Sequence, residues 1–288
     1  MAVALTPHDS ALALAGMDEA VFARWVALLE RRTGVVVAPQ RKPFLVSAVR
    51  ARMREVGYGN FMQYFEHISA PGAGAVEWAT LVDRLTVHET RFFRHMPSFD
   101  LIRERWLPER LGNGIGALHA WSVGCASGEE AWSLAMVLHH GLLGHGGKVH
   151  FGVTASDVSS AAVATARAAI YPCGRIEEVP ALYRAKYVEM RGEEAFTPIA
   201  SLRKRVAFAR VNLLQAAAAP LQRLNLIFCQ NVLMYFARER RRELLDGLAG
   251  LLEPQGLLLI GPGEVTSWSH PALTRVAWQG TLAYQRRD

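Results

Sequence analysis

Two adjacent glutamates follow a turn of small residues in the segment Leu118–Glu130, LHAWSVGCASGEE. The apolar run predicts a β-strand, which ends at Gly124-Cys125-Ala126-Ser127-Gly128, and a patterned helix begins at Glu129. The first N–H groups of a helix have no partners within the helix. This turn therefore predicts the edge of a pocket for a small polar ligand.

The two glutamates restrict the charge of that ligand. A dinucleotide site normally reads G-x-G-x-x-G and leaves the helix start free for an anion. Here the spacing is G-x-x-x-G, and Glu129 and Glu130 would repel a pyrophosphate. A cationic cofactor fits better, and S-adenosylmethionine carries both an ammonium and a sulfonium. Glu129 is the better candidate for the ammonium, whereas Glu130 is equally expected to form a capping box with Ser127.

Polar residues also follow two later strands of the sequence. Asp157 ends Ala155-Ser156-Asp157, where an acid can accept hydrogen bonds from the ribose hydroxyls of an adenosine. Its structural alternative is to cap a helix that starts near Ser159. Asn231 follows Cys229-Gln230, and its alternative is an ordinary turn residue. Tyr235, a little further on, has a place in the core as its alternative.

The elements that must position these residues alternate between strands and helices after Arg94. Short apolar runs separated by helices favour a parallel sheet covered on both faces, an α/β fold, and such sheets bind ligands at the carboxyl ends of their strands. The connection from Tyr171 to Val211 is long for one crossover and predicts a small inserted subdomain. The expected strands are Leu118–Val123, Val149–Ala155, Val206–Arg210, Leu224–Cys229 and Leu257–Ile260, and the expected helices are Glu129–His140, Ala161–Ala169 and Arg238–Leu252.

The residues before this pattern look helical throughout. Apolar residues recur at helical spacing in four stretches between Met17 and Arg84, and Gly34, Gly57 and the turn at 71–74 separate them. These stripes are interpreted as the core of a small bundle. The predicted organisation is a tail at 1–16, a helical domain at 17–85, and an α/β domain at 86–288 with its insert at about 171–211.

Composition restricts the classes of partner and compartment. The 288-residue chain has a net charge of +6, which suggests an acidic partner, and 51% hydrophobic residues, enough for a substantial core. No apolar run of about 18 residues predicts a membrane span, and the first residues do not read as a signal peptide. The three cysteines are far apart, which suits a reducing cytoplasm and offers no metal site.

The positive charge is concentrated in one part of the helical region. Seven basic residues and no acid occur between Arg31 and Arg54, in a segment predicted to include a helix. A solvated helix surface is the plain interpretation of this run, and a partner-binding surface is the alternative.

Four segments together resemble the chemotaxis receptor methyltransferases, a family of S-adenosylmethionine-dependent protein-glutamate O-methyltransferases. The first, Thr86–Arg94 (TVHETRFFR), is similar to the family's T-x-N-x-T-x-F-F-R. The others are VGCASGEE at Val123–Glu130, Ala155-Ser156-Asp157, and FCQNVLMYF at Phe228–Phe236. Asn212-Leu213 and the helical N-terminal region match as well, so the resemblance covers roughly residues 20 to 285.

The resemblance implies a Rossmann-like class I methyltransferase domain behind an all-helical domain. It places Arg94 and Tyr235 near the transferred methyl group. It implies that a basic helix faces the acidic helical bundle of a chemoreceptor, through Arg41, Lys42, Arg50, Arg52 and Arg54. It implies a cofactor site made of His88, Thr90, Arg94, Glu129, Asp157, Asn212, Leu213, Gln230 and Asn231.

The chain departs from the family pattern at two of these positions. His88 replaces an Asn and is bulkier, and Gln230 replaces an Arg, which removes a fixed positive charge beside the cofactor. The loop after Met190 lacks the extra glycines of members that dock a receptor's tail peptide, so no such tether is expected. The C-terminal segments GPGEV and LTRVAWQGTLAYQRR suggest a divergent branch that would serve a pilus-linked signalling array.

The resemblance implies methyl transfer to receptor glutamates by a cytoplasmic, monomeric enzyme. Two other classes remain open at this point. A nucleic-acid methyltransferase would suit the basic charge, but Asn231 is followed by Val232-Leu233-Met234 rather than by the prolines of [DN]-P-P-[YFW], so no nucleic-acid partner is expected. A non-catalytic module that senses the cofactor and binds a partner would show cofactor binding without turnover.

Overall fold

The computed structural model describes residues 17–145, 148–218 and 221–288. The chain divides into two compact units, Met1–Val87 and His88–Asp288. The tail predicted at 1–16 lies outside the described residues. Within the described ranges, no helix is both long enough and apolar enough to cross a membrane.

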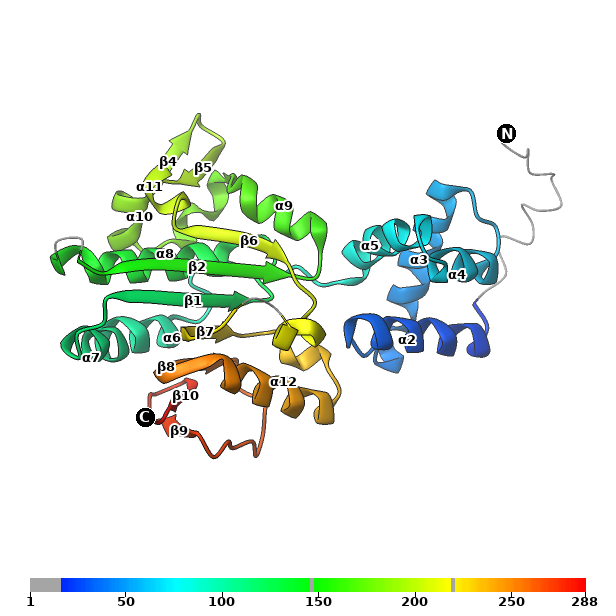
Figure 1. The fold of residues 1–288 in the computed structure, drawn as a ribbon. Helices are drawn as coiled ribbons and strands as arrows, with labels where there is room; N and C mark the ends of the chain where they lie inside the picture. The colour runs from blue at the N-terminus through cyan, green and yellow to red at the C-terminus, as the bar shows by residue number, and fades with distance from the viewer. Residues whose placement is uncertain (1–16, 146–147, 219–220) are drawn as a thin grey trace. The chain divides into compact units, whose positions relative to one another are not determined.

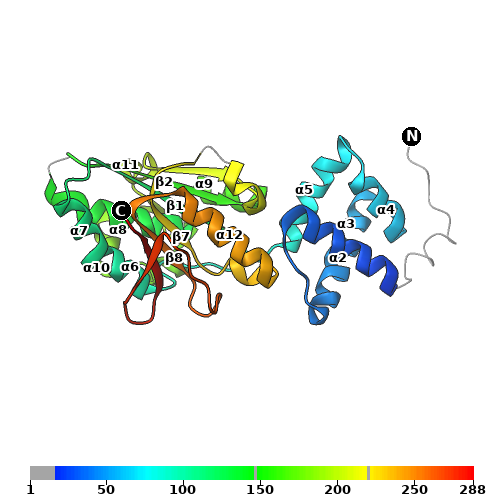
Figure 2. The same cartoon turned by 60° about the horizontal axis from the view of Figure 1, so that its bottom comes forward.

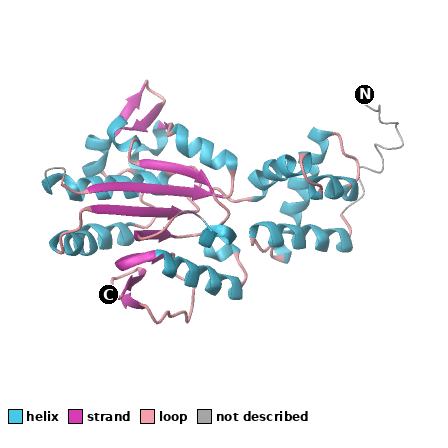
Figure 3. Ribbon diagram, viewed as in Figure 1, coloured by secondary structure: helices cyan, strands magenta, loops and turns pink. Residues whose placement is uncertain are grey.

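The first unit is helical, as its apolar stripes predict (Figure 3). Asp18 caps the first helix, since its Oδ1 accepts a 2.7 Å hydrogen bond from Val21 N–H. Gly34 and Gly57 end the first two helices at φ 77° and 81°, a left-handed conformation that glycine adopts without steric cost. The helices are α2 (Glu19–Thr33), α3 (Lys42–Val56), α4 (Phe61–Ser69) and α5 (Ala73–Leu85), with a 3-10 turn at Pro39–Arg41.

A buried ionic network joins three helices of this unit. Glu77 on α5 accepts hydrogen bonds from Arg52 on α3 at 2.8 and 2.7 Å and from the Tyr64 hydroxyl on α4 at 2.6 Å. The hydrogen bonds from Arg52 lower the pKa of Glu77. Arg52, which is predicted to face a partner, is therefore also engaged inside the unit through its guanidinium.

Replacing Glu77 with Ala is expected to destabilise the first unit by about 3 kcal/mol, because it leaves Arg52 and the Tyr64 hydroxyl without their acceptor. Urea unfolding followed by circular dichroism measures the change. Glu66→Ala, on the exposed surface of α4, is the control and should change stability by less than about 0.5 kcal/mol. Equal stability of the two variants would contradict the prediction.

The same network has a defined pH dependence. Folding lowers the pKa of Glu77 below its ordinary value. The ionised carboxylate therefore stabilises the fold fully when the pH is above that ordinary pKa. The contribution is lost as the pH falls through the folded-state pKa. The stability difference between the native chain and Glu77→Ala should therefore shrink under acid.

The second unit is built on a seven-stranded sheet with the order β6-β2-β1-β7-β8-β10-β9 (Figure 1). The first five of these strands pair in parallel, and β10 is antiparallel to both of its neighbours. The chain moves outward from β1 to β2 and later returns to β7, so the order reverses between β1 and β7. The strands are β1 (Ala117–Val123), β2 (His150–Asp157), β6 (Val206–Arg210), β7 (Leu224–Cys229), β8 (Leu252–Ile260), β9 (Leu273–Val276) and β10 (Leu282–Arg286).

Helices cover both faces of this sheet (Figures 1 and 2). Alternate residues of one strand enter different cores, because successive side chains point to opposite faces. Leu226 and Phe228 of β7 join the core under α8, whereas Ile227 and Cys229 join the core under α12. This confirms the predicted α/β fold. The helices are α6 (Met96–Leu101), α7 (Leu107–Gly112), α8 (Glu129–Leu142), α9 (Ser160–Ala168) and α12 (Arg238–Leu251), with a π-helical turn at Ile102–Trp106.

The connection between α9 and β6 forms a small sheet of its own, with the order β3-β5-β4. Its buried aromatic residues Tyr171, Tyr183 and Phe196 join the core on the α8 side of the main sheet. The inserted elements are β3 (Tyr171–Pro172), a 3-10 helix η4 (Cys173–Glu178), α10 (Ala181–Tyr187), β4 (Val188–Arg191), β5 (Ala195–Pro198) and α11 (Ala200–Arg203). The insert therefore packs onto the main sheet.

Candidate functional site

The loops at the carboxyl ends of β1, β2 and β7 gather most of the acids singled out in the sequence. Asp157, Glu130 and Glu129 lie around one thiol, because all three raise the pKa of Cys125 in addition to the effect of burial. This edge includes the point between β1 and β7 where the strand order reverses. Open parallel sheets bind ligands at such a point.

Two glycines fix the path of the turn after β1. Gly124 and Gly128 have φ of 67° and 97°, values that disfavour any residue with a Cβ. A Cβ on Gly124 would lie 2.4 Å from a methyl of Val232, and one on Gly128 would lie 2.8 Å from the Cβ of Ala166. The turn therefore approaches the loop after β7 and helix α9 too closely for a larger residue.

Asp157 ties the end of β2 to this turn. Its Oδ2 accepts a 2.9 Å hydrogen bond from Ala126 N–H, and its Oδ1 accepts one of 2.9 Å from Ser159 N–H. Ser159, and not Asp157, is the N-cap of α9, since its hydroxyl accepts from Ala162 N–H. Each carboxylate oxygen retains a lone pair, so Asp157 can hold the turn and accept further hydrogen bonds.

Glu129 is fully buried, with none of its surface exposed, and is ion-paired. The Ser127 hydroxyl donates to its carboxylate at 2.7 Å, and Arg175 from the inserted η4 donates to the same carboxylate. Arg175 also donates to the Thr90 carbonyl at 2.6 Å and to Glu178, whose Oε2 accepts from Phe92 N–H. This network joins the turn after β1, the insert and the TVHETRFFR segment.

Glu130 takes a different position from the one its spacing suggests. The capping box with Ser127 is wrong, because Ser127 pairs with Glu129 instead. Glu130 turns toward β1, where its Oε1 accepts a 2.7 Å hydrogen bond from the Ser122 hydroxyl. Burial raises the pKa of Glu130 to about 8. The second acid of the pair is therefore a buried carboxyl group whose charge is poorly compensated.

The TVHETRFFR segment is anchored by its two phenylalanines. Phe92 packs edge-on against Tyr171 with ring centroids 4.9 Å apart, and Phe93 stacks on Tyr183 at 4.9 Å. Arg94 remains exposed, and its Nη1 donates a 2.7 Å hydrogen bond to the Glu89 carbonyl. Its charge acts on Glu130, whose pKa it lowers. His88 and Thr90 are half-buried on the same segment.

The loop after β7 is held by a buried acid, Glu264, that sequence reasoning did not single out. Its Oε2 accepts hydrogen bonds from the N–H groups of Asn231 and Gly261 at 2.9 and 3.0 Å, and its Oε1 accepts from Met234 N–H at 3.1 Å. Asn231 has φ of 60°, a left-handed conformation that Asn tolerates better than most residues. Tyr235 follows in the 3-10 helix Leu233–Tyr235 and is half-buried.

Arg241 of α12 holds the opposite side of the same loop. Its guanidinium donates to the carbonyls of Phe236, Glu264 and Met234 at 2.8, 2.9 and 3.1 Å. Glu264 and Arg241 together fix the backbone on both sides of Tyr235. The GPGEV and RERRRE segments gave no signal for this role, since neither pattern distinguishes a buried residue from an exposed one.

The remaining predicted cofactor residues lie near the ends of β6 and β7. The Gln230 amide donates to the Ser98 hydroxyl at 2.8 Å and to the Ile260 carbonyl at 3.2 Å, so its N–H groups are used within the protein. Asn212 and Leu213 follow β6, and the Asn212 side chain accepts from Leu214 N–H at 3.1 Å. The carbonyl of Asp157 accepts from Val211 N–H, which brings this loop beside β2.

The basic residues of the first unit differ in their surroundings. Lys42 pairs with Glu19 at 2.6 Å, and Arg50 lies over the Phe61 ring at 5.8 Å. Arg41 lies 5.0 Å from the exposed Phe44 ring, and Arg54 is exposed. In the described part of the chain, no ion pair is recorded for Arg41 or Arg54.

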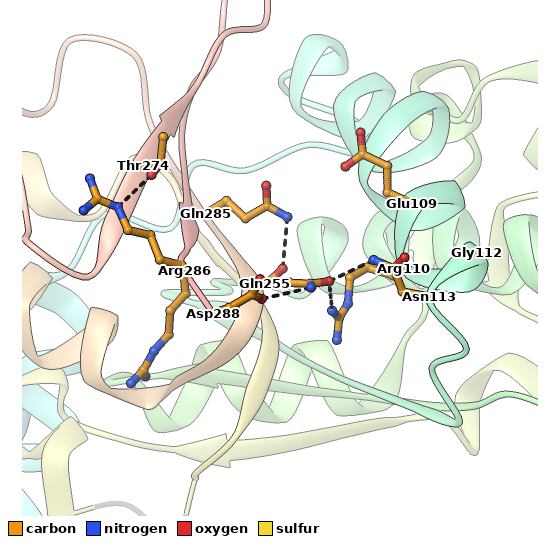
Figure 4. Close-up of a pocket in the computed structure, with 10 residues that line it drawn as sticks. Glu109, Arg110, Gly112, Asn113, Gln255, Thr274, Gln285, Arg286 and Asp288 are labelled. Carbon is orange, nitrogen blue, oxygen red and sulfur yellow. Dashed lines mark hydrogen bonds between the residues drawn. The ribbon is translucent and has the colours of Figure 1, made fainter.

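A cleft of about 600 Å³ lies away from this edge, near the beginning of β8 (Figure 4). Its polar side chains bind one another. Arg110 and Asn113 donate to Gln255 Oε1 at 2.7 and 3.0 Å, and the Gln255 amide donates to Asp288 at 2.9 Å. The cleft is lined by residues of α7 and of the strands β8, β9 and β10, together with the last two residues of the chain, so it is separate from the acid-rich site.

The electrostatics of the carboxyl edge suit a positively charged ligand. Glu129 and Glu264 are buried, Glu130 has a raised pKa, and Asp157 adds a fourth carboxyl group. A cation placed among these groups would compensate charge that burial makes costly. Hydrogen-bond acceptors for hydroxyl groups are present on Asp157. This set of carboxylate acceptors therefore fits S-adenosylmethionine better than it fits a phosphate.

Comparison with known proteins identifies relatives for both units. Residues 88–279 match the family described as CheR methyltransferase, SAM binding domain, and residues 20–86 match CheR methyltransferase, all-alpha domain. The chain is 32% identical over 240 residues to chemotaxis protein methyltransferase 2 of Pseudomonas aeruginosa, covering 82% of this chain and 83% of the relative. It is 28% identical over 245 residues to the chemotaxis protein methyltransferase of Borreliella burgdorferi, covering 84% and 86%.

Proposed function

This chain belongs to the CheR methyltransferase family, and from that membership we propose that it methylates glutamate side chains of chemoreceptors to form methyl esters. S-adenosylmethionine is its methyl donor. The observation that supports the proposal best is the cluster of acids at the switch point between β1 and β7, beside an exposed arginine.

The proposed site residues have separate tasks. Glu129 binds the cofactor's ammonium, and Asp157 accepts hydrogen bonds from its ribose. His88, Thr90, Asn212, Leu213 and Asn231 line the rest of the site. Gln230 contributes through its Oε1 or its backbone, because its N–H groups are bound to Ser98 and Ile260. When bound, the cofactor supplies a methyl group activated by its positively charged sulfur.

The protein's main chemical task is to orient the receptor carboxylate. A glutamate has an ordinary pKa of about 4.3, so at neutral pH it is already ionised and requires no general base. Arg94 is exposed and can donate two parallel hydrogen bonds to that carboxylate. In this proposal Tyr235, on a loop fixed by Glu264 and Arg241, orients the reacting groups through its hydroxyl. Such orientation contributes roughly 7–11 kcal/mol to catalysis.

The first unit supplies the proposed docking surface for an acidic receptor bundle. The predicted basic residues differ in their internal contacts, and Arg41 and Arg54 are the least committed of Arg41, Lys42, Arg50, Arg52 and Arg54. A cytoplasmic location and a monomeric state complete the proposal. The pilus-linked branch stays a prediction.

Reversing the charge of Arg41 and Arg54 together, to Glu, is expected to raise KM for the receptor about tenfold, because it replaces attraction with repulsion. Cofactor affinity should not change, since the binding site lies in the other unit. The effect should weaken at high salt, which screens exposed charges. Lys204→Glu with Arg242→Glu, at exposed positions of the second unit, is a charge-matched control. An unchanged KM would contradict the docking assignment.

The function is tested by incubating the purified protein with tritiated S-adenosylmethionine and membranes that contain chemoreceptors. Base-labile label on a receptor-sized band is expected, because carboxyl methyl esters hydrolyse in base. Label that resists base would contradict glutamate methylation. Cofactor binding without any label would favour a non-catalytic sensing module, and label on added nucleic acid would favour a nucleic-acid methyltransferase.

A further inference from the structure

The end of the TVHETRFFR segment has a strained backbone. Phe93 has φ of 50°, a left-handed conformation that is unfavourable for a bulky residue. Such a conformation persists only where the surrounding contacts hold it. On one side, Phe93 is held by its stack on Tyr183 and by a 3.0 Å hydrogen bond from its N–H to the Ser133 hydroxyl. Arg94 comes next, so its direction also depends on what holds His95, the residue that follows.

A chain of hydrogen bonds holds the His95 ring. Its Nδ1 lies 2.8 Å from the hydroxyl of Ser98, which is fully buried on α6. The same hydroxyl accepts a 2.8 Å hydrogen bond from the Gln230 amide, after β7. The ring also forms a hydrogen bond with the backbone of Gly280, in the turn before β10. That turn lies close to α6, since a Cβ on Gly280 would be 3.6 Å from the Pro97 ring. Three segments that are distant in sequence therefore meet at His95.

Backbone carbonyls at the two ends fix the direction of the protons in this chain. The Gln230 amide nitrogen lies 3.2 Å from the Ile260 carbonyl, which can only accept, so the NH₂ group faces Ser98. Burial lowers the pKa of His95, and the hydrogen bond with Gly280 opposes this fall, as expected where the ring donates to a carbonyl. The Ser98 hydroxyl is then left to donate to His95 Nδ1. This arrangement requires a neutral His95 that is protonated on Nε2.

The charged side chains on the surrounding elements do not favour protonation of His95. In the described part of the chain, none of them has a recorded effect on its pKa. Asp100 and Arg103 pair with each other at 2.9 Å, and Arg105 donates to the Ala277 carbonyl at 3.3 Å. The others are Arg91 and Arg94 before His95, Glu264 after β8 and Arg275 on β9. Protonation would make Nδ1 a donor, so the Ser98 hydroxyl would have to turn away from it.

We propose that His95 is a positioning residue that holds Arg94 in place relative to the loop lining the cofactor site. The inference rests on the proposed function. His95 fixes the backbone next to Arg94, and Ser98 links it to Gln230, which directly precedes Asn231 of that loop. Turnover therefore depends on a neutral His95, whereas cofactor binding, which uses residues of several other loops, depends on it much less.

The first test separates kcat for receptor methylation from the Kd of the cofactor. In His95→Leu, which cannot accept from Ser98, kcat should fall about tenfold, while the calorimetric Kd for S-adenosylmethionine changes less than about threefold. In His95→Asn, the side-chain oxygen can take the place of Nδ1, so kcat at about pH 7.5 should stay within about threefold of the native value. His150→Leu, at an exposed position of β2, is the control for loss of a histidine. Equal kcat values in the two His95 variants would overturn the proposal.

A pH profile provides a readout that a purely structural role would not change. The ratio of native kcat to that of His95→Asn should be constant above the ordinary histidine pKa of about 6.5 and fall below it, because only the native side chain becomes protonated. The midpoint should lie below about 6.5, since burial lowers the pKa of His95. Other titrating groups, including the receptor glutamate, are common to both proteins and cancel in the ratio. A ratio that does not vary with pH would contradict the proposal.

Nuclear magnetic resonance of nitrogen-labelled histidine tests the chain of hydrogen bonds without an activity assay. Native His95 should be protonated on Nε2 and have a pKa below about 6.5. In Gln230→Glu, the carboxylate would accept from the Ser98 hydroxyl, whose oxygen could then accept from protonated His95. The pKa of His95 should therefore rise above about 6.5 in this variant. The exposed His150 is an internal control in the same spectra.

The two kinds of measurement separate this inference from the proposed function. If the native protein methylates no receptor while the resonances of His95 behave as expected, the proposed function is wrong and the chain of hydrogen bonds is present. If the native protein is active but His95 is protonated on Nδ1, or keeps its pKa in Gln230→Glu, only the role of His95 is wrong.

Discussion

Arg94→Ala should lower the turnover of receptor methylation about 100-fold while cofactor affinity changes less than about threefold. The side chain is exposed at the acid-rich edge, and its hydrogen bond to the Glu89 carbonyl at 2.7 Å limits where the guanidinium lies. Loss of that guanidinium removes the group proposed to align the receptor carboxylate. Arg94 is expected to form this charge-assisted pair only with the receptor carboxylate. Titration with the cofactor alone therefore does not detect its loss.

Two further variants make the result specific. Arg94→Lys keeps the charge but lacks the planar fork, so it should recover only part of the activity. Arg91→Ala removes an exposed arginine of the same segment and should leave turnover nearly unchanged. A methyl-transfer assay and calorimetric cofactor titration provide the two readouts. Equal losses of turnover and cofactor affinity in Arg94→Ala would contradict the assignment.

Asp157→Ala should weaken cofactor binding at least about 100-fold, because it removes the proposed ribose acceptors and leaves two backbone donors unpaired. Its two oxygens now hold the N–H groups of Ala126 and Ser159, each at 2.9 Å. Ala126 is buried and has φ of 46°, so the turn after β1 depends on that contact. The variant thus loses a direct ligand contact and the support of the turn that forms the other side of the site.

Asp157→Asn distinguishes these two contributions. The amide oxygen can still accept from one backbone N–H, but the amide nitrogen can only donate, so an intermediate loss of about tenfold is expected. Equilibrium titration of the cofactor measures both variants, and circular dichroism checks that the sheet is intact. Native affinity in Asp157→Ala would exclude the residue from the site.

The sequence predicts the fold well because its signals are local. Apolar periodicity and glycine stops gave the four N-terminal helices, and short apolar runs gave β1, β2, β6 and β7. The expected start of β8 at Leu257 was late, since the strand begins at Leu252. Pro254-Gln255-Gly256 interrupts the apolar pattern, and the pairing with β7 shifts register there. A pattern of side-chain polarity cannot reveal an irregular but paired strand.

The site was less predictable because its contacts join distant segments. Motif spacing singled out Glu129, Asp157 and Asn231, yet it paired Ser127 with the wrong glutamate. Arg175 and Glu264 were missed altogether. Each is an ordinary charged residue in its own segment and acquires its role only through partners brought together by the fold. The ion pair of Arg52 was missed for the same reason, since its partner Glu77 is on another helix.

The parts of the inserted subdomain differ in how freely their residues can be replaced, in evolution or by engineering. Its small sheet and α10 contain exposed side chains such as Leu182 and Met190, which can be exchanged without touching the acid-rich site. The adjoining η4 supplies Arg175 and Glu178, which bind Glu129 and the backbone at Thr90 and Phe92. A chimera that exchanges the segment between Glu178 and Ala200 should therefore keep Tyr183, which stacks on Phe93, and Phe196, which pairs with Tyr171 of β3. A cut at Tyr171 would carry away part of the active site with the graft.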